Sequence, residues 1–238
     1  MHLLIPAAGM GKRMGSDRNK LRLSLLGKPI LAWTLLAAEA AQRIQWIGLI
    51  GQPEDEPMWQ ECLQSLGLSK PVKLIRGGTT RQESVYNGLQ ALPADATQVL
   101  IHDGARCLAT PSLIDRCADA LDTHLGFVAA IPVKDTIKVV DENLQVRDTP
   151  ARAHLWAAQT PQGFDVAKLK ACHEAGRRQG WEVTDDAALF EKFDLPVHIV
   201  MGEETNLKIT TPEDLKIATL ILQQRWDKAT TDAPIEAC

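Results

Sequence analysis

The feature that most constrains the fold is a regular alternation of short apolar runs with longer amphipathic segments. The apolar runs lie at 3–6, 46–50, 72–75, 98–102, 127–132 and 197–201. Helical patterns lie between and after them, at 29–43, 54–67, 80–92, 111–123, 165–179 and 212–226. Strands that alternate with helices of about ten to fifteen residues are typical of βαβ units, whose parallel sheet is covered on both faces. We therefore predict an α/β fold, a Rossmann-like three-layer sandwich with a mostly parallel sheet.

One stretch departs from this alternation. Within residues 133–159, period-two alternation flanks a turn at 141–143, which predicts a β-hairpin. A two-stranded ribbon is marginally stable alone, so we expect a protruding β-hairpin arm for dimerisation, packed on a partner subunit. The rest is predicted to be a single domain over residues 1–226. Residues 227–238 are polar or small and are expected to form a disordered tail.

Composition argues against several classes of function. The net charge of −4 argues against nucleic acid or an anionic membrane as partner. The five cysteines and six histidines are dispersed, without CxxC or HxxxH spacing, so neither a disulfide framework nor a zinc site is expected. No window approaches the ~18 apolar residues of a membrane span, and the N-terminus lacks a signal-peptide pattern. We expect a cytoplasmic protein.

The loop after the first predicted strand is suited to binding phosphate. It has the sequence PAAGMGKRM over residues 6–14. Its two glycines permit close approach of backbone N–H groups to an anion, and Lys12 and Arg13 supply positive charge. Met14 at the third glycine position excludes the dinucleotide fingerprint, and Pro6 at the first excludes a Walker A loop. Taken alone, the loop also fits a glycine-rich turn with solvated basic side chains.

Further motifs, which follow in order, resemble one family. The loop, with Lys20 seven residues after Arg13, resembles the signature of sugar-phosphate nucleotidyltransferases. The later motifs are similar to those of the 2-C-methyl-D-erythritol 4-phosphate cytidylyltransferases: GGTTRQESV at 77–85, HDGAR at 102–106, PVKDT at 132–136, WAAQTPQ at 156–162, TDDA at 184–187, NLKIT at 206–210 and PEDL at 212–215. The resemblance extends from residue 3 to about 225.

This resemblance implies transfer of CMP from CTP to 2-C-methyl-D-erythritol 4-phosphate, with release of pyrophosphate, in non-mevalonate isoprenoid biosynthesis. The nucleophile is a phosphate monoester that is already ionised, so no general base is needed, and the sequence shows no nucleophilic triad. Catalysis must instead stabilise negative charge that grows on the α-phosphate. The resemblance assigns this to Arg13 and Lys20, and it implies Mg²⁺ held mainly by the CTP phosphates, without a confident protein ligand.

The same resemblance assigns the binding residues. For CTP they are Ala7, Ala8, Gly9, Gly11, Gly78, Ser84, Asp103, Ala105 and Arg106, with Gly78 and Ser84 facing cytosine. For the phosphorylated polyol they are Asp103, Thr136, Arg152 and Lys208. Thr136 and Arg152 are expected to come from the arm of the neighbouring subunit, which implies a homodimer with arm exchange. Counting back from Trp156 favours Arg152 over Arg147.

Several residues also fit purely structural roles. Arg81 fits a ligand contact and an ordinary helix-surface position equally well. Asp103 also fits a turn or helix-start aspartate, and His102 is typical of a structural histidine at a strand end. The run 184–186 is typical of an N-cap with acidic residues in the first helical turn.

The sequence departs from the common family pattern in three places. Asn19 replaces a proline before Lys20, with Leu21 and Arg22 also unusual, which predicts a less rigid lysine loop. The other departures are Thr79, Gly104 and Cys107. Two rival functions stay open: a ribitol-5-phosphate cytidylyltransferase and a non-catalytic sugar-nucleotide sensor. The sensor is disfavoured because binding alone would not require the full set Arg13, Lys20, Asp103, Arg152 and Lys208.

Overall fold

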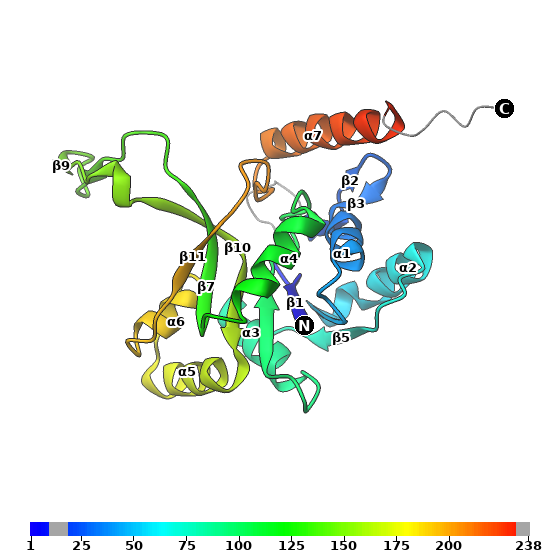
Figure 1. The fold of residues 1–238 in the computed structure, drawn as a ribbon, viewed down its shortest axis with the longest axis horizontal. Helices are drawn as coiled ribbons and strands as arrows, with labels where there is room; N and C mark the ends of the chain where they lie inside the picture. Colours follow the sequence, from blue (N-terminus) through cyan, green and yellow to red (C-terminus); the bar gives the residue numbers. More distant parts are fainter. Residues whose placement is uncertain (10–18, 232–238) are drawn as a thin grey trace.

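A computed structural model describes residues 1–9 and 19–231 (Figure 1). Its seven-stranded sheet has the order β11-β7-β10-β6-β1-β4-β5. Six strands confirm the predicted apolar runs: β1 (His2–Pro6), β4 (Trp46–Gly51), β5 (Val72–Arg76), β6 (Gln98–Ile101), β7 (Gly126–Pro132) and β11 (His198–Met201). β6, β1, β4 and β5 pair in parallel, and so do β11 and β7. The mostly parallel α/β sheet is therefore confirmed.

The seventh strand, β10 (Trp156–Asp165), was not predicted. It lies between β7 and β6 and runs antiparallel to both. Its middle carries Gln159, Thr160 and Gln162, which are buried although polar. A hydrophobicity pattern misses such a strand because polar side chains can be buried when they are hydrogen-bonded. Residues 156–159, assigned to the arm from the sequence, thus belong to the start of this strand.

The helices cover both faces of the sheet. Six follow the predicted helical patterns: α1 (Ile30–Ala40), α2 (Glu56–Leu66), α3 (Arg81–Gln90), α4 (Pro111–Ala120), α5 (Val166–Gln179) and α7 (Pro212–Thr231). The short α6 (Ala187–Glu191) begins directly after the run 184–186 that predicted a helix start. Side chains alternate across a strand, so Leu3 and Ile5 of β1 enter one core with α1 and α4, whereas Leu4 enters a second core with α3 and α5. The result is a three-layer sandwich.

The last helix extends beyond its predicted end. α7 continues to Thr231, so residues 227–231 are helical and not part of a tail. Polar residues do not by themselves end a helix, and the first proline after Pro212 is Pro234. Residues 232–238 lie outside the described part of the chain.

The predicted hairpin protrudes from the body of the molecule (Figure 1). Its strands, β8 (Val139–Val140) and β9 (Val146–Asp148), pair antiparallel and are shorter than the alternation suggested. Asp141 organises the turn, because its carboxylate accepts hydrogen bonds from the backbone N–H groups of Asn143 and Gln145. A second short hairpin, β2 (Ser24–Leu25) with β3 (Lys28–Pro29), follows the 3-10 turn η2 (Lys20–Arg22).

Candidate active site

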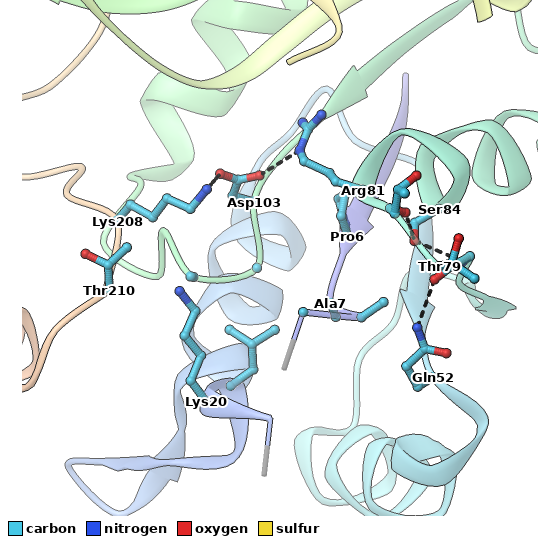
Figure 2. Close-up of a pocket in the computed structure, with 17 residues that line it drawn as sticks. Pro6, Ala7, Lys20, Gln52, Thr79, Arg81, Ser84, Asp103, Lys208 and Thr210 are labelled. Atoms are coloured by element: carbon cyan, nitrogen blue, oxygen red, sulfur yellow. Dashed lines mark hydrogen bonds and ion pairs between the residues drawn. The ribbon is translucent and has the colours of Figure 1, made fainter. Parts of the chain in front are cut away.

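A pocket of about 570 Å³ opens beyond the carboxyl ends of β1, β4 and β6 (Figure 2). This is where parallel α/β sheets place their ligands. Its lining comes from the loops after these strands and after β5, from η2, from the start of α3 and from the loop before α7. The lining residues are Pro6, Ala7, Ala8, Gly9, Lys20, Leu21, Gln52, Gly78, Thr79, Thr80, Arg81, Ser84, Asp103, Gly104, Ala105, Lys208 and Thr210.

Backbone pairing continues past the strand ends and brings the first loop beside Asp103. The Ala7 N–H donates to the Ile50 carbonyl at 2.6 Å, and the Gly104 N–H lies 3.4 Å from the Pro6 carbonyl. Gly104 is also where two departures from the family pattern meet, since a Cβ there would lie 2.9 Å from the Leu21 Cδ1. A side chain at position 104 would therefore crowd Leu21.

Asp103 is the carboxylate around which the cations of the pocket gather. It is buried, and its Oδ2 lies 2.7 Å from the Lys208 Nζ while its Oδ1 lies 3.7 Å from the Arg81 Nε. Burial alone raises the pKa of Asp103, but Arg81 and Lys208 outweigh it and hold the pKa at about 2. A third cation, Lys20, donates from its Nζ to the Ile209 carbonyl at 2.6 Å, next to Lys208 in the chain. Asp103 is therefore ionised at neutral pH beside several cations.

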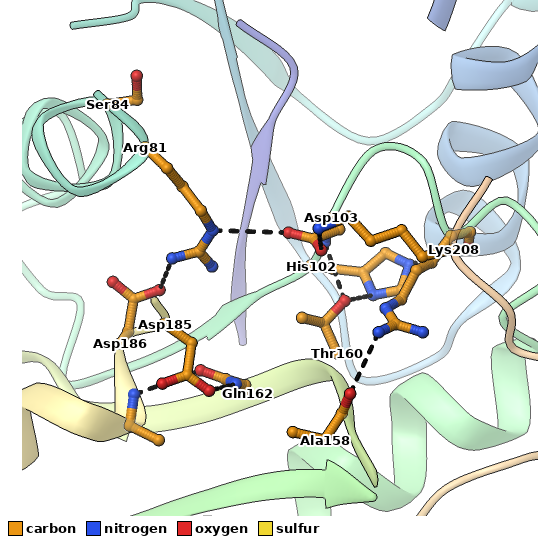
Figure 3. Close-up of polar contacts among 12 residues, drawn as sticks. Arg81, Ser84, His102, Asp103, Ala158, Thr160, Gln162, Asp185, Asp186 and Lys208 are labelled. Carbon is orange, nitrogen blue, oxygen red and sulfur yellow. Dashed lines mark hydrogen bonds and ion pairs between the residues drawn. The ribbon is translucent and has the colours of Figure 1, made fainter. Parts of the chain in front are cut away.

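A chain of hydrogen bonds supports Asp103 from behind (Figure 3). Its backbone N–H donates to the Thr160 Oγ1 at 2.9 Å, and this hydroxyl lies 3.0 Å from the His102 Nδ1. The His102 Nε2 lies 3.2 Å from the Arg106 carbonyl, which can only accept, so Nε2 carries the proton and the Thr160 hydroxyl donates to Nδ1. Burial lowers the pKa of His102 to about 4, which keeps the ring neutral. The prediction of a structural histidine is confirmed.

Arg81 links the pocket to a second buried carboxylate. Its Nη1 donates to the Asp186 Oδ2 at 2.8 Å, and Figure 3 shows the guanidinium between Asp186 and Asp103. Asp186 also lies 3.1 Å from the His173 Nε2. Burial acts to raise the pKa of Asp186, but the charge of Arg81 and the hydrogen bonds from Arg81 and His173 together outweigh it and lower this pKa. Arg81 is thus a pocket residue with two carboxylate partners, and not a solvated helix-surface arginine.

The two acidic residues before α6 have different roles. Asp185 fits the predicted capping interaction, because its Oδ1 accepts from the Ala188 N–H at 3.1 Å. Asp186 makes no side-chain capping bond and is instead the buried partner of Arg81. The sequence pattern therefore correctly indicated a helix start, but it missed the ion pair because Arg81 lies 105 residues away.

The opposite side of the pocket presents glycines and backbone groups. The Ser84 hydroxyl donates to the Thr80 carbonyl at 2.9 Å and accepts from the Gly78 N–H at 3.0 Å, so it shapes this loop from within. The Gln52 Nε2 donates to the Gly78 carbonyl at 3.0 Å. Gln52 was not identified from the sequence, although its place directly after β4 is the position where functional residues gather. Recognition of cytosine by Gly78 and Ser84 stays a prediction.

The structure brings together most, but not all, of the residues assigned from the sequence. The pocket lining includes Ala7, Ala8, Gly9, Lys20, Gly78, Ser84, Asp103, Ala105 and Lys208. Arg106 is not part of that lining: its Nη1 donates to the Asn206 carbonyl at 2.7 Å and its Nη2 to the Ala158 carbonyl at 3.3 Å. Thr136 and Arg152 lie in the arm, outside this pocket. Gly11 and Arg13 lie outside the described residues.

Comparison with known proteins gives a consistent result. The family model for 2-C-methyl-D-erythritol 4-phosphate cytidylyltransferase matches residues 1–224. A protein of that name from Acaryochloris marina is 75% identical over 96% of each chain. A solved structure of 4-diphosphocytidyl-2C-methyl-D-erythritol synthase from Anaerococcus prevotii is 34% identical and covers 93% of this chain and 97% of its own, with a TM-score of 0.84.

A second solved structure, 2-C-methyl-D-erythritol 4-phosphate cytidylyltransferase from Thermus thermophilus, is 32% identical with a TM-score of 0.77 and covers 93% of this chain and 98% of its own. The matches span nearly the whole chain in sequence and in structure, and they include the strands and loops that form the pocket. The chain therefore belongs to the 2-C-methyl-D-erythritol 4-phosphate cytidylyltransferase family.

Proposed function

We propose that this pocket is where the chain transfers CMP from CTP to 2-C-methyl-D-erythritol 4-phosphate and releases pyrophosphate. The observation that carries the proposal is the buried Asp103 with Arg81 and Lys208 on its two oxygens and Lys20 close by. Both substrates are phosphate anions, and their approach needs fixed positive charge in a site shielded from water. Across the pocket, the loop at Gly78 is the part that we assign to the cytosine ring.

Lys20 is the residue to which we assign stabilisation of the transition state. Its ammonium group reaches the pocket and donates to the Ile209 carbonyl, a neutral acceptor that an ionised phosphate oxygen can replace. Charge on the α-phosphate oxygens increases as the second phosphate attacks, so a fixed cation binds the transition state more tightly than the ground state. Arg13 is assigned the same function from the family resemblance alone.

Asp103 and Lys208 are assigned to the phosphorylated polyol. An ionised carboxylate has about four lone-pair sites, so Asp103 can accept from a substrate hydroxyl while Lys208 stays bound. The Lys208 ammonium is compact and flexible, which suits contact with a phosphate oxygen. Because the nucleophile is already ionised, neither residue is required to remove a proton.

The pocket also fits Mg²⁺. Among its described lining residues, Asp103 is the single carboxylate, and the described chain holds no cluster of three His, Cys, Asp or Glu that could bind a metal. Mg²⁺ is commonly held by one or two carboxylates together with substrate phosphates and water, so Asp103 and the CTP phosphates would be sufficient. When bound, the ion neutralises charge on the triphosphate. The chain's own cations would then act mainly at the α-phosphate.

We assign the arm to a homodimer in which it reaches the neighbouring active site. Support comes from its surface, because Val139, Val140, Leu144 and Val146 are exposed in the single chain. Exposed apolar side chains in one segment are typical of an interaction surface. Thr136 and Arg152 would then contact the phosphorylated polyol in the partner subunit. In its own chain, the Arg152 guanidinium donates to the Lys134 carbonyl.

A cytoplasmic location is the last part of the proposal. The cysteines in the described part of the chain, Cys62, Cys107, Cys117 and Cys172, are free and buried, as is usual in a reducing compartment. Each helix within the described ranges is too short or too polar to cross a membrane.

The substrate assignment is tested by following pyrophosphate release from CTP with Mg²⁺. One reaction contains 2-C-methyl-D-erythritol 4-phosphate, a second ribitol 5-phosphate, and a third no acceptor. We expect turnover in the first alone, with loss of activity on chelation of Mg²⁺ and recovery on its return. Turnover with ribitol 5-phosphate alone would overturn the substrate, and no turnover with either would favour a non-catalytic sensor.

A further inference from the structure

Asn19, directly before Lys20, is buried and uses its whole amide group in hydrogen bonds. Its Nδ2 donates to the Ala7 carbonyl at 2.6 Å and to the Asp55 Oδ2 at 2.8 Å. Its Oδ1 accepts from the Leu21 N–H at 3.1 Å, which caps the turn η2. One side chain therefore joins the end of β1, the segment after β4 and the turn that carries Lys20.

Asp55 is the second half of this arrangement. It ends the 3-10 turn η3 (Pro53–Asp55), is 8% exposed, and lies outside the pocket lining. Its Oδ1 lies 3.6 Å from the Arg22 Nη1, and its backbone N–H donates to the carbonyl of the pocket residue Gln52 at 3.0 Å. A carboxylate is costly to bury without partners, so the contacts to Asn19 and Arg22 account for its position.

We propose that Asn19 and Asp55 are positioning residues for cytidylyl transfer. They fix the backbone of Lys20 relative to Ala7 at the pocket. Lys20 has a long, flexible side chain, so its ammonium group is placed accurately only if its backbone is fixed. One hydrogen bond of the preceding residue joins this backbone to Ala7 after β1, and a second joins it to Asp55 in the segment after β4. The third caps the turn η2 itself. On this proposal, the contacts of Asn19 offset the loss of a proline at position 19, for which the sequence predicted a less rigid lysine loop.

The expected consequence is on the rate of the chemical step. A shift of about 1 Å in a catalytic group can cost roughly 10²-fold in rate. Neither Asn19 nor Asp55 lines the pocket, so loss of their contacts leaves most ground-state contacts to CTP in place. Variants should therefore lower kcat much more than they raise the KM for CTP.

The first variant is Asn19→Ser, compared with Asn87→Ser as a matched control. Serine still caps η2 but is too short to reach both Ala7 and Asp55. The control removes an asparagine that donates to the Arg76 carbonyl at 3.2 Å, outside the pocket. We expect Asn19→Ser to lower kcat about tenfold, with the KM for CTP within about threefold, and Asn87→Ser to leave both unchanged.

A rescue pair separates positioning from a general loss of structure. Asn19→Asp places a carboxylate against Asp55 and the Ala7 carbonyl, and it should lower kcat further. The swap Asn19→Asp with Asp55→Asn returns a donor and an acceptor to the contact between these two side chains, but not the hydrogen bond to the Ala7 carbonyl. It should therefore recover part of the kcat that Asn19→Asp loses. The Tm of each variant is measured so that all assays are made well below unfolding.

The inference rests on the proposed function, and the experiment keeps the two apart. If the wild-type chain shows no CMP transfer, the proposed function fails. If the wild type is active, and Asn19→Ser keeps its kcat within twofold, changes only KM, or changes only Tm, the positioning function is overturned. A swap variant no more active than Asn19→Asp would also overturn it. If Asn19→Asp does not fold, Asn19→Ser decides the matter alone.

Discussion

In the pocket Asp103 is buried between Arg81 and Lys208, whereas in the arm Leu144 remains 81% exposed beside other uncovered apolar side chains. Each charged group of the pocket interior has partners from distant segments of the same chain. The arm is held mainly by its own turn, where Asp141 binds backbone N–H groups and Arg147.

This difference indicates which part of the site the chain completes alone. Preorganised charge lowers a barrier because it needs no rearrangement during the reaction, and the pocket side has that property. In the proposed homodimer, the arm would gain an equivalent order from the partner subunit that covers it. A substitution in the pocket should therefore lower the activity of the subunit that carries it. A substitution in the arm should lower the activity of the partner subunit.

The largest effect is expected from Lys20→Ala. Loss of one preorganised charge at the transition state should lower kcat by about 10²–10³-fold, with a much smaller change in the KM for CTP. Steady-state kinetics with varied CTP measures both. Lys73→Ala is the control, since the Lys73 Nζ also donates to a backbone carbonyl, that of Ala91, outside the pocket. An effect of Lys20→Ala confined to KM would show that Lys20 only binds ground-state phosphate.

The next effect concerns the support behind Asp103. Because the pKa of buried His102 is about 4 in the folded chain, against about 6.5 when unfolded, only the unfolded chain takes up this proton between these values. The stability contributed by the neutral ring is thus complete above pH 6.5 and falls as pH decreases towards 4. The loss amounts to about 3 kcal/mol at roughly 1.4 kcal/mol per pH unit.

His102→Gln tests this pH dependence. The glutamine has no titrating group, so urea unfolding followed from pH 7 to pH 4 should show a flatter decline than in the wild type. Asp103 does not affect this comparison. Its pKa is lowered from 3.8 to about 2, so the stability that it contributes is lost only below pH 4. Equal slopes for the two proteins would contradict a neutral, buried His102.

The smallest effect, and the one that tests the arm directly, is complementation between inactive subunits. Lys20→Ala and Arg152→Ala chains are mixed and allowed to exchange. If each site uses Lys20 of one chain and Arg152 of the other, half of the dimers are mixed and each has one intact site, giving about a quarter of wild-type activity. Activity no higher than that of the separate variants, despite proven subunit exchange, would show that the site is not shared.

Patterns within short segments predicted much of the fold. Short apolar runs identified six of the seven strands in the main sheet, and amphipathic patterns identified the six longest helices, because such patterns are a property of each segment by itself. β10 escaped because Gln159, Thr160 and Gln162 are buried through hydrogen bonds to residues elsewhere in the chain.

The candidate site, like the fold, was predicted from the sequence only in part. The place of Lys20 and Asp103 in their motifs was sufficient to assign them to the pocket, because loops after parallel strands converge at one sheet edge. Arg106 was assigned to CTP as well, but its guanidinium turns to the carbonyls of Asn206 and Ala158. A motif fixes which residue is present, but the packing around it fixes where a long side chain points.

The sequence by itself thus determined the layers of the sheet, the family, and the loops that carry the chemistry. Only the tertiary structure decided that Arg81 lies between Asp103 and Asp186, and that Asn19 binds Asp55, 36 residues away. The physical reason is that such contacts depend on how distant segments pack, and the hydrophobic periodicity of a short segment carries no information about that packing. They are also the contacts that bury charge and fix catalytic side chains, where small displacements have large effects.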